Sequence, residues 1–422
     1  MISQGYTRLF LYIGIPLFIM GWWIFAFKNS YQPETSADFP LELANHEAFS
    51  YKTTTLPLSP ISRKALHQAL QGDFGLMSRL IADWDIEAQL LEEQGFQGVQ
   101  RLPHENFMRS QLLVKQKNFH ISRPTYLVDD KGKIFNLNHV FHRFLPQTQA
   151  AASILLALAS PEQIVAIPEG MRNQTKLYPA SLMEKIPLDI HRFHAERLYL
   201  QKPDIAFVAH YSHPATVTAL QQQGIHLYTM KNIDHIEDIH EVIGQLGALI
   251  HREREAELLK LFVEAAFLSI DNQLLAIREL TSGSPEQILY LNYYSQFSIP
   301  TARPLIGQLL ERLGILNCQF CHSQYDSAEQ WRLPISHEQI INLNPKAIIV
   351  SASNPKELHS HISSTALSHL TAVQKNQIYF VEDTAQDSPT HYILLAYYDL
   401  FQAIAHILTS STQALAEEGV AL

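Results

Sequence analysis

Residues 236–280 read IEDIHEVIGQLGALIHREREAELLKLFVEAAFLSIDNQLLAIREL, and this stretch decides the fold. Its apolar side chains recur at helical spacing, as in Ile239, Val242 and Leu246, and they predict one long amphipathic helix. The charged run from Glu253 to Glu257 interrupts the apolar stripe, either as a solvated face or as a bend. A helix of this length would join two domains as a strut and would restrict hinge motion between them.

The chain on both sides of this helix alternates short apolar runs with helical segments. Such alternation predicts parallel sheets covered by helices, so we expect an α/β protein with two Rossmann-like lobes. The expected division is an N-terminal lobe at 139–235, the linking helix at 236–280, a C-terminal lobe at 281–410 and a tail at 411–422. The apolar runs that we expect as strands are IVAI (164–167), IAFVA (205–209), HLYTM (226–230), ILYLNYY (288–294), AIIVSA (347–352) and IYFV (378–381).

The region before the first lobe has two parts. Residues 9–27, LFLYIGIPLFIMGWWIFAF, carry no charge, and as a helix they would reach about 28 Å, enough to cross a bilayer. We expect residues 1–29 to be a retained membrane anchor; the alternative is a cleaved signal peptide. Residues 30–138 predict a proline-rich stalk and an extension of unknown role, with helices over 62–116 and a hairpin over 125–137.

Composition excludes several classes of function. The 31 Lys and Arg stand against 41 acidic residues, and the net charge of −10 offers no broad basic field for nucleic acid. We find no glycine-rich phosphate loop and no nucleophile elbow, so we expect no enzyme and no catalytic residues. The 21 histidines include two close pairs, His191/His194 and His359/His361. Neither pair has a spacing that is diagnostic of a metal-binding site. We therefore expect no metal site and no cofactor.

Residues 318–322 read Cys-Gln-Phe-Cys-His. Cys318, Cys321 and His322 have the spacing of a c-type haem attachment site, in which two thioethers and one imidazole hold the haem. A local disulfide or two plain thiols is the alternative interpretation. A haem-carrying redox subunit is therefore one candidate function for the chain.

The order of lobe, long helix and lobe resembles the helical-backbone class (class III) of periplasmic binding proteins, which deliver iron-siderophores, haem and cobalamin to ABC importers. The resemblance extends over residues 144–407. The segments that carry it are FLPQTQAAASILLALASPEQIVAI (144–167), HAERLYLQKPDIAFVAHY (194–211), LIGQLLERLGILN (305–317), WRLPISHEQIINLNPKAIIV (331–350) and LSHLTAVQKNQIYFVEDTAQDSP (367–389).

This resemblance implies a membrane-anchored protein on the periplasmic or outer face that captures a metal chelate, with an ABC permease and its ATPase as partners. The alternatives are the haem-carrying redox subunit and a scaffold on the same fold that has lost transport. Glu196 and Glu338, each at the start of a helix in its own lobe, match the carboxylates with which the family docks onto its permease. Two such carboxylates on one rigid body would set the orientation of docking. The alternative for each is stabilisation of the helix start by a negative charge.

We expect the ligand cleft where doubly wound sheets bind ligands, at loops after the carboxyl ends of the strands. Aromatic faces with a few arginines suit a large planar chelate, because rings offer contact area and a guanidinium holds carboxylates. Tyr178, followed by Pro179, stands where haem-binding and cobalamin-binding relatives place a Tyr-Pro pair. Packing or plain exposure is the alternative for each candidate. The expected ligand-binding residues are Tyr178, His210, Tyr211, Tyr294, Arg303, Trp331 and Arg172.

Overall fold

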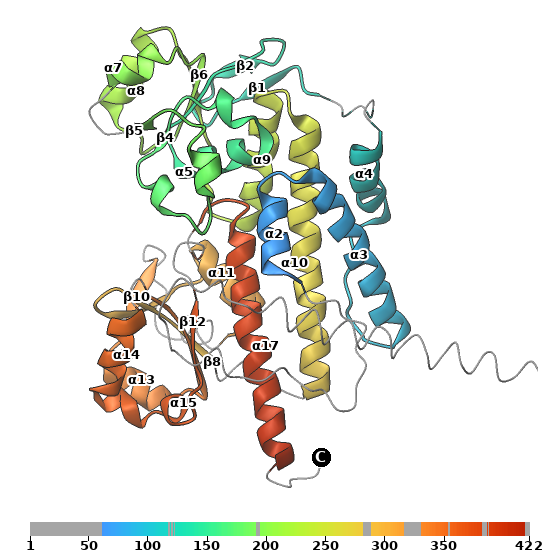
Figure 1. Cartoon of the computed structure of the whole chain (residues 1–422), viewed down its shortest axis with the longest axis vertical. Coiled ribbons are helices and arrows are strands. Elements are labelled where there is room, and N and C mark those ends of the chain that lie inside the picture. The colour runs from blue at the N-terminus through green and yellow to red at the C-terminus, as the bar shows by residue number, and fades with distance from the viewer. Residues whose placement is uncertain are drawn as a thin grey trace, which may run out of the picture.

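The computed structural model describes residues 61–417 apart from 117, 118, 120, 122, 191–194, 282–287, 316–330, 353–354, 382–385 and 387. Two α/β lobes lie one above the other beside a column of long helices (Figure 1). This arrangement confirms the two-lobed α/β fold. The expected membrane segment 9–27 and the Cys318/Cys321/His322 motif both lie outside the described residues. Within them, no helix combines the length and the hydrophobicity needed to cross a bilayer.

The N-terminal lobe is built on a three-stranded parallel sheet in the order β3-β6-β7. The helix after β3 begins at Thr148, whose hydroxyl accepts a hydrogen bond from the backbone N–H of Ala151 at 3.1 Å. A two-stranded parallel pair, β4 and β5, extends the lobe. The elements of this lobe are β3 (Phe144–Pro146), α5 (Gln149–Leu158), β4 (Ile167–Pro168), α6 (Ala180–Met183), β5 (Asp189–Ile190), α7 (Ala195–Leu200), β6 (Ile205–Val208), α8 (Pro214–Gln222) and β7 (His226–Thr229).

The C-terminal lobe has a five-stranded sheet in the order β10-β9-β8-β11-β12. Strands β8, β11 and β12 are parallel, as expected, but β9 runs antiparallel to both β8 and β10, so the sheet is mixed. The helix α13 begins with a capping box: Ser336 and Gln339 each accept the other's backbone N–H, at 3.2 and 2.8 Å. The elements are β8 (Ile288–Tyr293), β9 (Phe297–Pro300), α11 (Leu305–Arg312), β10 (Arg332–Pro334), α13 (His337–Leu343), β11 (Ala347–Ala352), α14 (Pro355–Ser363), α15 (Thr371–Gln374) and β12 (Ile378–Val381).

The expected single helix over 236–280 is wrong, because the chain breaks it into α9 (Ile236–Leu249) and α10 (Glu253–Thr281). The break falls at residues 250–252, just before the charged run, and Glu253–Glu257 form the first turn of α10. His251 adopts a positive φ of 59°, and α9 packs back against α10. The two helices approach so closely at Gly247 that an added Cβ would lie 2.3 Å from the Cβ of Ala256. The strut is α10 alone, whose 29 residues span about 43 Å.

The region before the lobes packs against this strut. Helices α2 (Arg63–Leu70), α3 (Phe74–Glu93) and α4 (His104–Lys115) confirm the helical extension, and α3 and α4 both pack on α10. The hairpin is confirmed as β1 (Tyr126–Val128) and β2 (Ile134–Asn136). Its Asp129 carboxylate accepts the backbone N–H of Thr229 at 3.1 Å, so the hairpin is fastened to the edge strand β7 of the N-terminal lobe.

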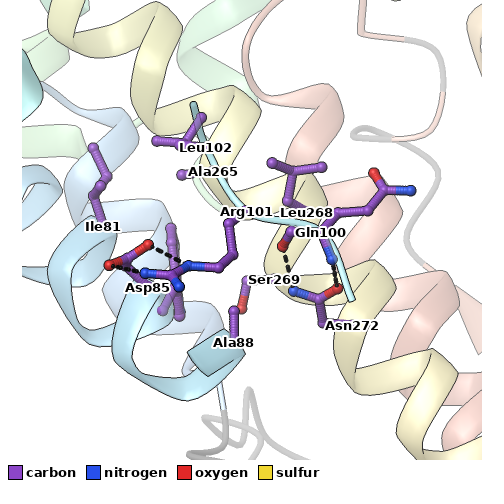
Figure 2. A pocket seen from close by; sticks show the side chains of 11 residues that line it. Ile81, Asp85, Ala88, Gln100, Arg101, Leu102, Ala265, Leu268, Ser269 and Asn272 are labelled. Atoms are coloured by element: carbon purple, nitrogen blue, oxygen red, sulfur yellow. Dashed lines mark hydrogen bonds and ion pairs between the residues drawn. The ribbon is translucent and has the colours of Figure 1, made fainter. Parts of the chain in front are cut away.

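The joint between α3 and α10 is sealed by polar contacts around a small hollow, which Figure 2 shows. Arg101 donates two hydrogen bonds to Asp85, at 2.9 and 2.8 Å. The side-chain amide of Asn272 exchanges two hydrogen bonds with the backbone of Gln100, at 2.9 and 2.8 Å. The hollow between them measures about 20 Å³, which is room for one water molecule and not for a ligand.

The last helix, α17 (Ile393–Glu417), runs along α10 and binds the extension. Arg63 makes a bidentate ion pair with Asp399, at 2.7 and 3.0 Å, and Tyr398 donates to the carbonyl of Ile61 at 2.7 Å. One continuous apolar core therefore joins the extension, both lobes and the long helices. The boundary that we expected at residue 410 falls inside this helix.

Candidate ligand-binding face and docking surfaces

The two lobes meet at the loop that follows β7. In the first turn of α11, the side-chain amide of Gln308 donates to the carbonyl of Asp234 at 2.7 Å and to the carbonyl of Arg303 at 3.2 Å. Asp234 follows the carboxyl end of β7, where a doubly wound sheet is expected to bind ligands. The backbone of Arg303 therefore lies at the junction between the lobes.

Two arginine–aromatic pairs lie on the β9–β10 ribbon of the C-terminal lobe. The Arg303 guanidinium carbon is 5.8 Å from the centre of the Trp331 ring, and that of Arg332 is 5.2 Å from the centre of the Tyr294 ring. Trp331 is 53% exposed and Tyr294 43%, although both are large apolar rings. Stacking of a cation on a ring holds the ring in place while leaving both groups open to solvent.

The sheet topology corrects one feature of the expected cleft. Tyr294 follows β8, but Trp331 precedes β10, which runs in the same direction as β8. Trp331 and Tyr294 therefore lie at opposite ends of the ribbon, and only Tyr294 follows the carboxyl end of a parallel strand. The side chain of Arg332 bridges toward Tyr294, and sequence reasoning missed it although it stands next to Trp331.

In the N-terminal lobe, His210 and Tyr211 follow β6 at the carboxyl edge, as expected. Both are exposed, Tyr211 by 70%, and their rings meet edge to face with centres 5.0 Å apart. The turn is closed by the hydroxyl of Ser212, which accepts the backbone N–H of Ala209 at 2.9 Å. These two rings are accessible without any rearrangement.

Tyr178 and Arg172 do not line such a surface. Tyr178 is completely buried; its hydroxyl is hydrogen-bonded to Ser153 at 2.5 Å, and its ring packs edge to face on Tyr392. Burial raises the pKa of Tyr178, so the phenol stays protonated. The guanidinium of Arg172 donates to Asp189 at 2.6 Å and to the carbonyl of Ile186 at 2.7 Å. Both side chains hold the lobe together in this structure.

The two expected docking carboxylates are exposed, each as the second residue of its helix. Glu196 lies on α7 of the N-terminal lobe and Glu338 on α13 of the C-terminal lobe. Both helices lie on the side of the molecule opposite to α3 and α4 (Figure 1). Each has an exposed aliphatic residue one turn further on, Leu200 at 78% and Ile341 at 38%, which sequence reasoning missed.

Two comparisons place this architecture among known proteins. The sequence profile of the family described as "Periplasmic binding protein" matches residues 147–385. No curated protein matches the chain. Several solved structures share the fold at low sequence identity.

A possible iron-binding, periplasmic solute-binding protein of Staphylococcus epidermidis is 18% identical, with a TM-score of 0.51 over 63% of this chain and 99% of its own. SirA of Staphylococcus aureus, in complex with staphyloferrin B, is 17% identical, with a TM-score of 0.51 over 67% of this chain and 98% of its own. MolA of Haemophilus influenzae, bound to molybdate, is 14% identical, with a TM-score of 0.51 over 68% and 93%. The profile match covers more than half of the chain, and the chain therefore belongs to the periplasmic binding protein family, in its helical-backbone class.

Proposed function

We propose that this chain is an extracytoplasmic solute-binding protein that captures a metal chelate and delivers it to an ABC permease. The iron-siderophore class is the first candidate ligand, followed by haem and cobalamin. Family membership supports the general role, and the fold is shared with proteins whose described ligands are staphyloferrin B and molybdate. The proposal adds the class of ligand and the surfaces that recognise it.

The observation that carries the ligand class is the presence of two exposed arginine–aromatic pairs, Arg303/Trp331 and Arg332/Tyr294, one toward each end of the β9–β10 ribbon. A flat ring covers an apolar or π-rich part of a chelate, and a guanidinium holds carboxylate or catecholate oxygens through two parallel hydrogen bonds. A small sugar would require dense hydrogen-bonding groups in its place. His210 and Tyr211 of the other lobe complete the proposed face.

The direct test exposes the purified full chain to a mixture of ferric siderophores, haem and corrinoids, followed by native mass spectrometry of what it retains. We expect one anionic chelate to be retained, and calorimetry then measures its affinity. Retention of none of these classes by the folded chain would refute the proposal. A haem Soret band that survives denaturation would select covalent haem at Cys318, Cys321 and His322 instead.

We further propose that Glu196 and Glu338 dock onto the permease, with Leu200 and Ile341 beside them as apolar contacts. Charged groups at the rim of an interface steer association and fix its orientation more than they add affinity. Glu196→Arg and Glu338→Arg should each lower uptake of the chelate by about several-fold, because each reverses a charge at the rim of the docking interface. Chelate affinity should be unchanged. Glu357→Arg, an exposed carboxylate on α14, is the matched control. Loss of chelate affinity in either variant would contradict the assignment.

The proposed location is the outer face of the membrane, held by residues 9–27. Protease added to intact spheroplasts should digest the lobes while leaving cytoplasmic markers whole. Protection of the lobes would exclude a transport role.

A further inference from the structure

Two histidines from separate helices meet in the C-terminal lobe. His337 opens α13 and His361 lies near the end of α14, and their Nε2 atoms are 3.1 Å apart. The two residues are separated by 24 positions in the chain, so the pairing arises only in the folded lobe. Neither the family match nor the proposed cleft and docking carboxylates make use of this pair.

The two imidazole rings pack against buried aromatic side chains. The ring of His361 has its centre 5.5 Å from that of Tyr293 and 5.9 Å from that of Phe297. The ring of His337 is 5.7 Å from Phe297, and the two imidazoles are 5.0 Å apart. Tyr293 and Phe297 are 6% and 4% exposed, so they are fixed in the lobe core, whereas both histidines remain partly open to solvent. Packing against Tyr293 and Phe297 limits how far the two imidazole rings can turn away from each other.

We propose that His337 and His361 form a binding site for a divalent transition-metal ion of the zinc class. Two nitrogen ligands at about 2.0–2.1 Å from a tetrahedral zinc ion lie about 3.3 Å apart, close to the separation seen here. Neutral imidazole nitrogens suit zinc, copper and nickel more than the hard ions calcium and magnesium. The described residues contain no group of three or more metal-ligating side chains, so water would complete the coordination.

Without metal, one Nε2 must carry a proton and donate it to the other, because two bare lone pairs would repel. Binding requires both Nε2 atoms as acceptors, so that proton moves through solvent to Nδ1 of the same ring. The proton therefore remains on its own ring while both Nε2 lone pairs become available to the ion. Acid opposes binding, because protonated imidazoles cannot be ligands.

The site would tie α13 to α14 directly beside a proposed docking residue, since His337 precedes Glu338. A bound ion would hold the first turn of α13 in place and add positive charge near that carboxylate. The site does not depend on the proposed transport function, because neither histidine is among the residues of the proposed chelate face.

The test titrates the full chain with zinc chloride alone, in calorimetry, with no chelate present. We expect one binding event whose affinity falls at least about tenfold in His337→Gln and in His361→Gln, as for loss of a metal ligand. His359→Gln, which removes an exposed histidine from the same helix α14, should leave the event unchanged. An identical zinc titration in the His337→Gln/His361→Gln double variant would overturn the proposal.

A second readout guards against loss of folding in the variants. Zinc should raise the Tm of the unaltered chain and of His359→Gln, because a ligand that binds only the folded state stabilises it. The Tm of the two site variants should respond much less to zinc, and without zinc it should match that of the unaltered chain. A zinc response retained by both variants would also overturn the site, and chelate retention, measured separately, would be unaffected.

Discussion

The two lobes use the same residue types in opposite ways. In the N-terminal lobe, Tyr178 is completely buried. The guanidinium of Arg172 is paired with Asp189 and donates hydrogen bonds to backbone carbonyls. In the C-terminal lobe, Trp331 and Tyr294 are about half exposed and each is stacked with an arginine. Aromatic rings and arginines are therefore exposed in one lobe, where we propose the ligand face, and are buried or paired within the structure in the other.

The extension explains the difference. On α2, His67 bonds through Nε2 to the carbonyl of Leu177 at 2.8 Å, and its ring meets that of Tyr392 with centres 6.0 Å apart. His391, fully buried, bonds to the carbonyl of Leu70 at 3.0 Å and stacks on Tyr392. Tyr178 packs on the same Tyr392 ring. The extension and α17 thus enclose the N-terminal cluster, and no comparable element covers Trp331 and Tyr294 among the described residues.

The largest effect is expected at Tyr178. Tyr178→Ala should lower the free energy of unfolding by about 3–5 kcal/mol, because it leaves a cavity beside Tyr392. Tyr178→Phe should cost only about 1 kcal/mol, the hydrogen bond to Ser153, and should keep chelate affinity. Urea unfolding and calorimetry measure the two quantities. Full stability with lost chelate affinity in Tyr178→Phe would instead assign the phenol to the ligand site.

The next effect concerns acid. Burial lowers the pKa of His391 to about 4, whereas an exposed imidazole has a pKa of about 6.5. As the pH falls below about 6.5 the unfolded chain takes up this proton and the folded chain does not, so up to about 3 kcal/mol of stability is lost by about pH 4.

The variant that tests this is His391→Asn, which should flatten the fall in unfolding free energy between pH 6.5 and 4. The slope should decrease and not vanish, because burial also lowers the pKa of His226 and His240. His359→Asn, at an exposed position, is the control and should retain the full slope. An unchanged slope in His391→Asn would show that the buried cluster does not govern acid stability.

Variants of Trp331 and Arg303 in the C-terminal lobe should lose chelate binding and keep their stability, the opposite of what we expect at Tyr178. Trp331→Ala and Arg303→Ala should each weaken chelate binding by about 1–3 kcal/mol, through lost ring contact or a lost charged hydrogen bond. Their unfolding free energies should change by no more than about 0.5 kcal/mol. Arg303→Lys keeps the charge and loses the planar fork, so it separates charge from bidentate recognition. Unaltered affinity in all three would move the ligand face away from this ribbon.

The smallest effect is expected at the surface of the extension. Arg101→Ala should cost about 0.2–1 kcal/mol, because its pairing with Asp85 is partly exposed and the attraction is screened. The loss should shrink as salt is raised. A loss much larger than this, independent of salt, would mean that the joint in Figure 2 acts as a buried contact.

Several features follow from local patterns in the sequence. The alternation of apolar runs and helical stretches predicts both lobes, and the Asp129–Gly132 turn predicts the hairpin. Apolar residues repeat with a characteristic period in strands and in helices, and that period can be seen within a short stretch of sequence. These features need only contacts between residues a few positions apart.

Other features depended on the tertiary structure. The charged run at 253–257 was compatible with a solvated face or a bend, and only the structure showed that it begins α10 and that the bend lies just before it, at residues 250–252. Trp331 and Tyr294 were separated by the strand order, and Tyr178 was buried by an extension that lies far away in sequence. His337 and His361 met only across two helices. The exposure of a side chain depends on which other residues pack over it. The type of a residue and its spacing in the sequence do not identify those residues.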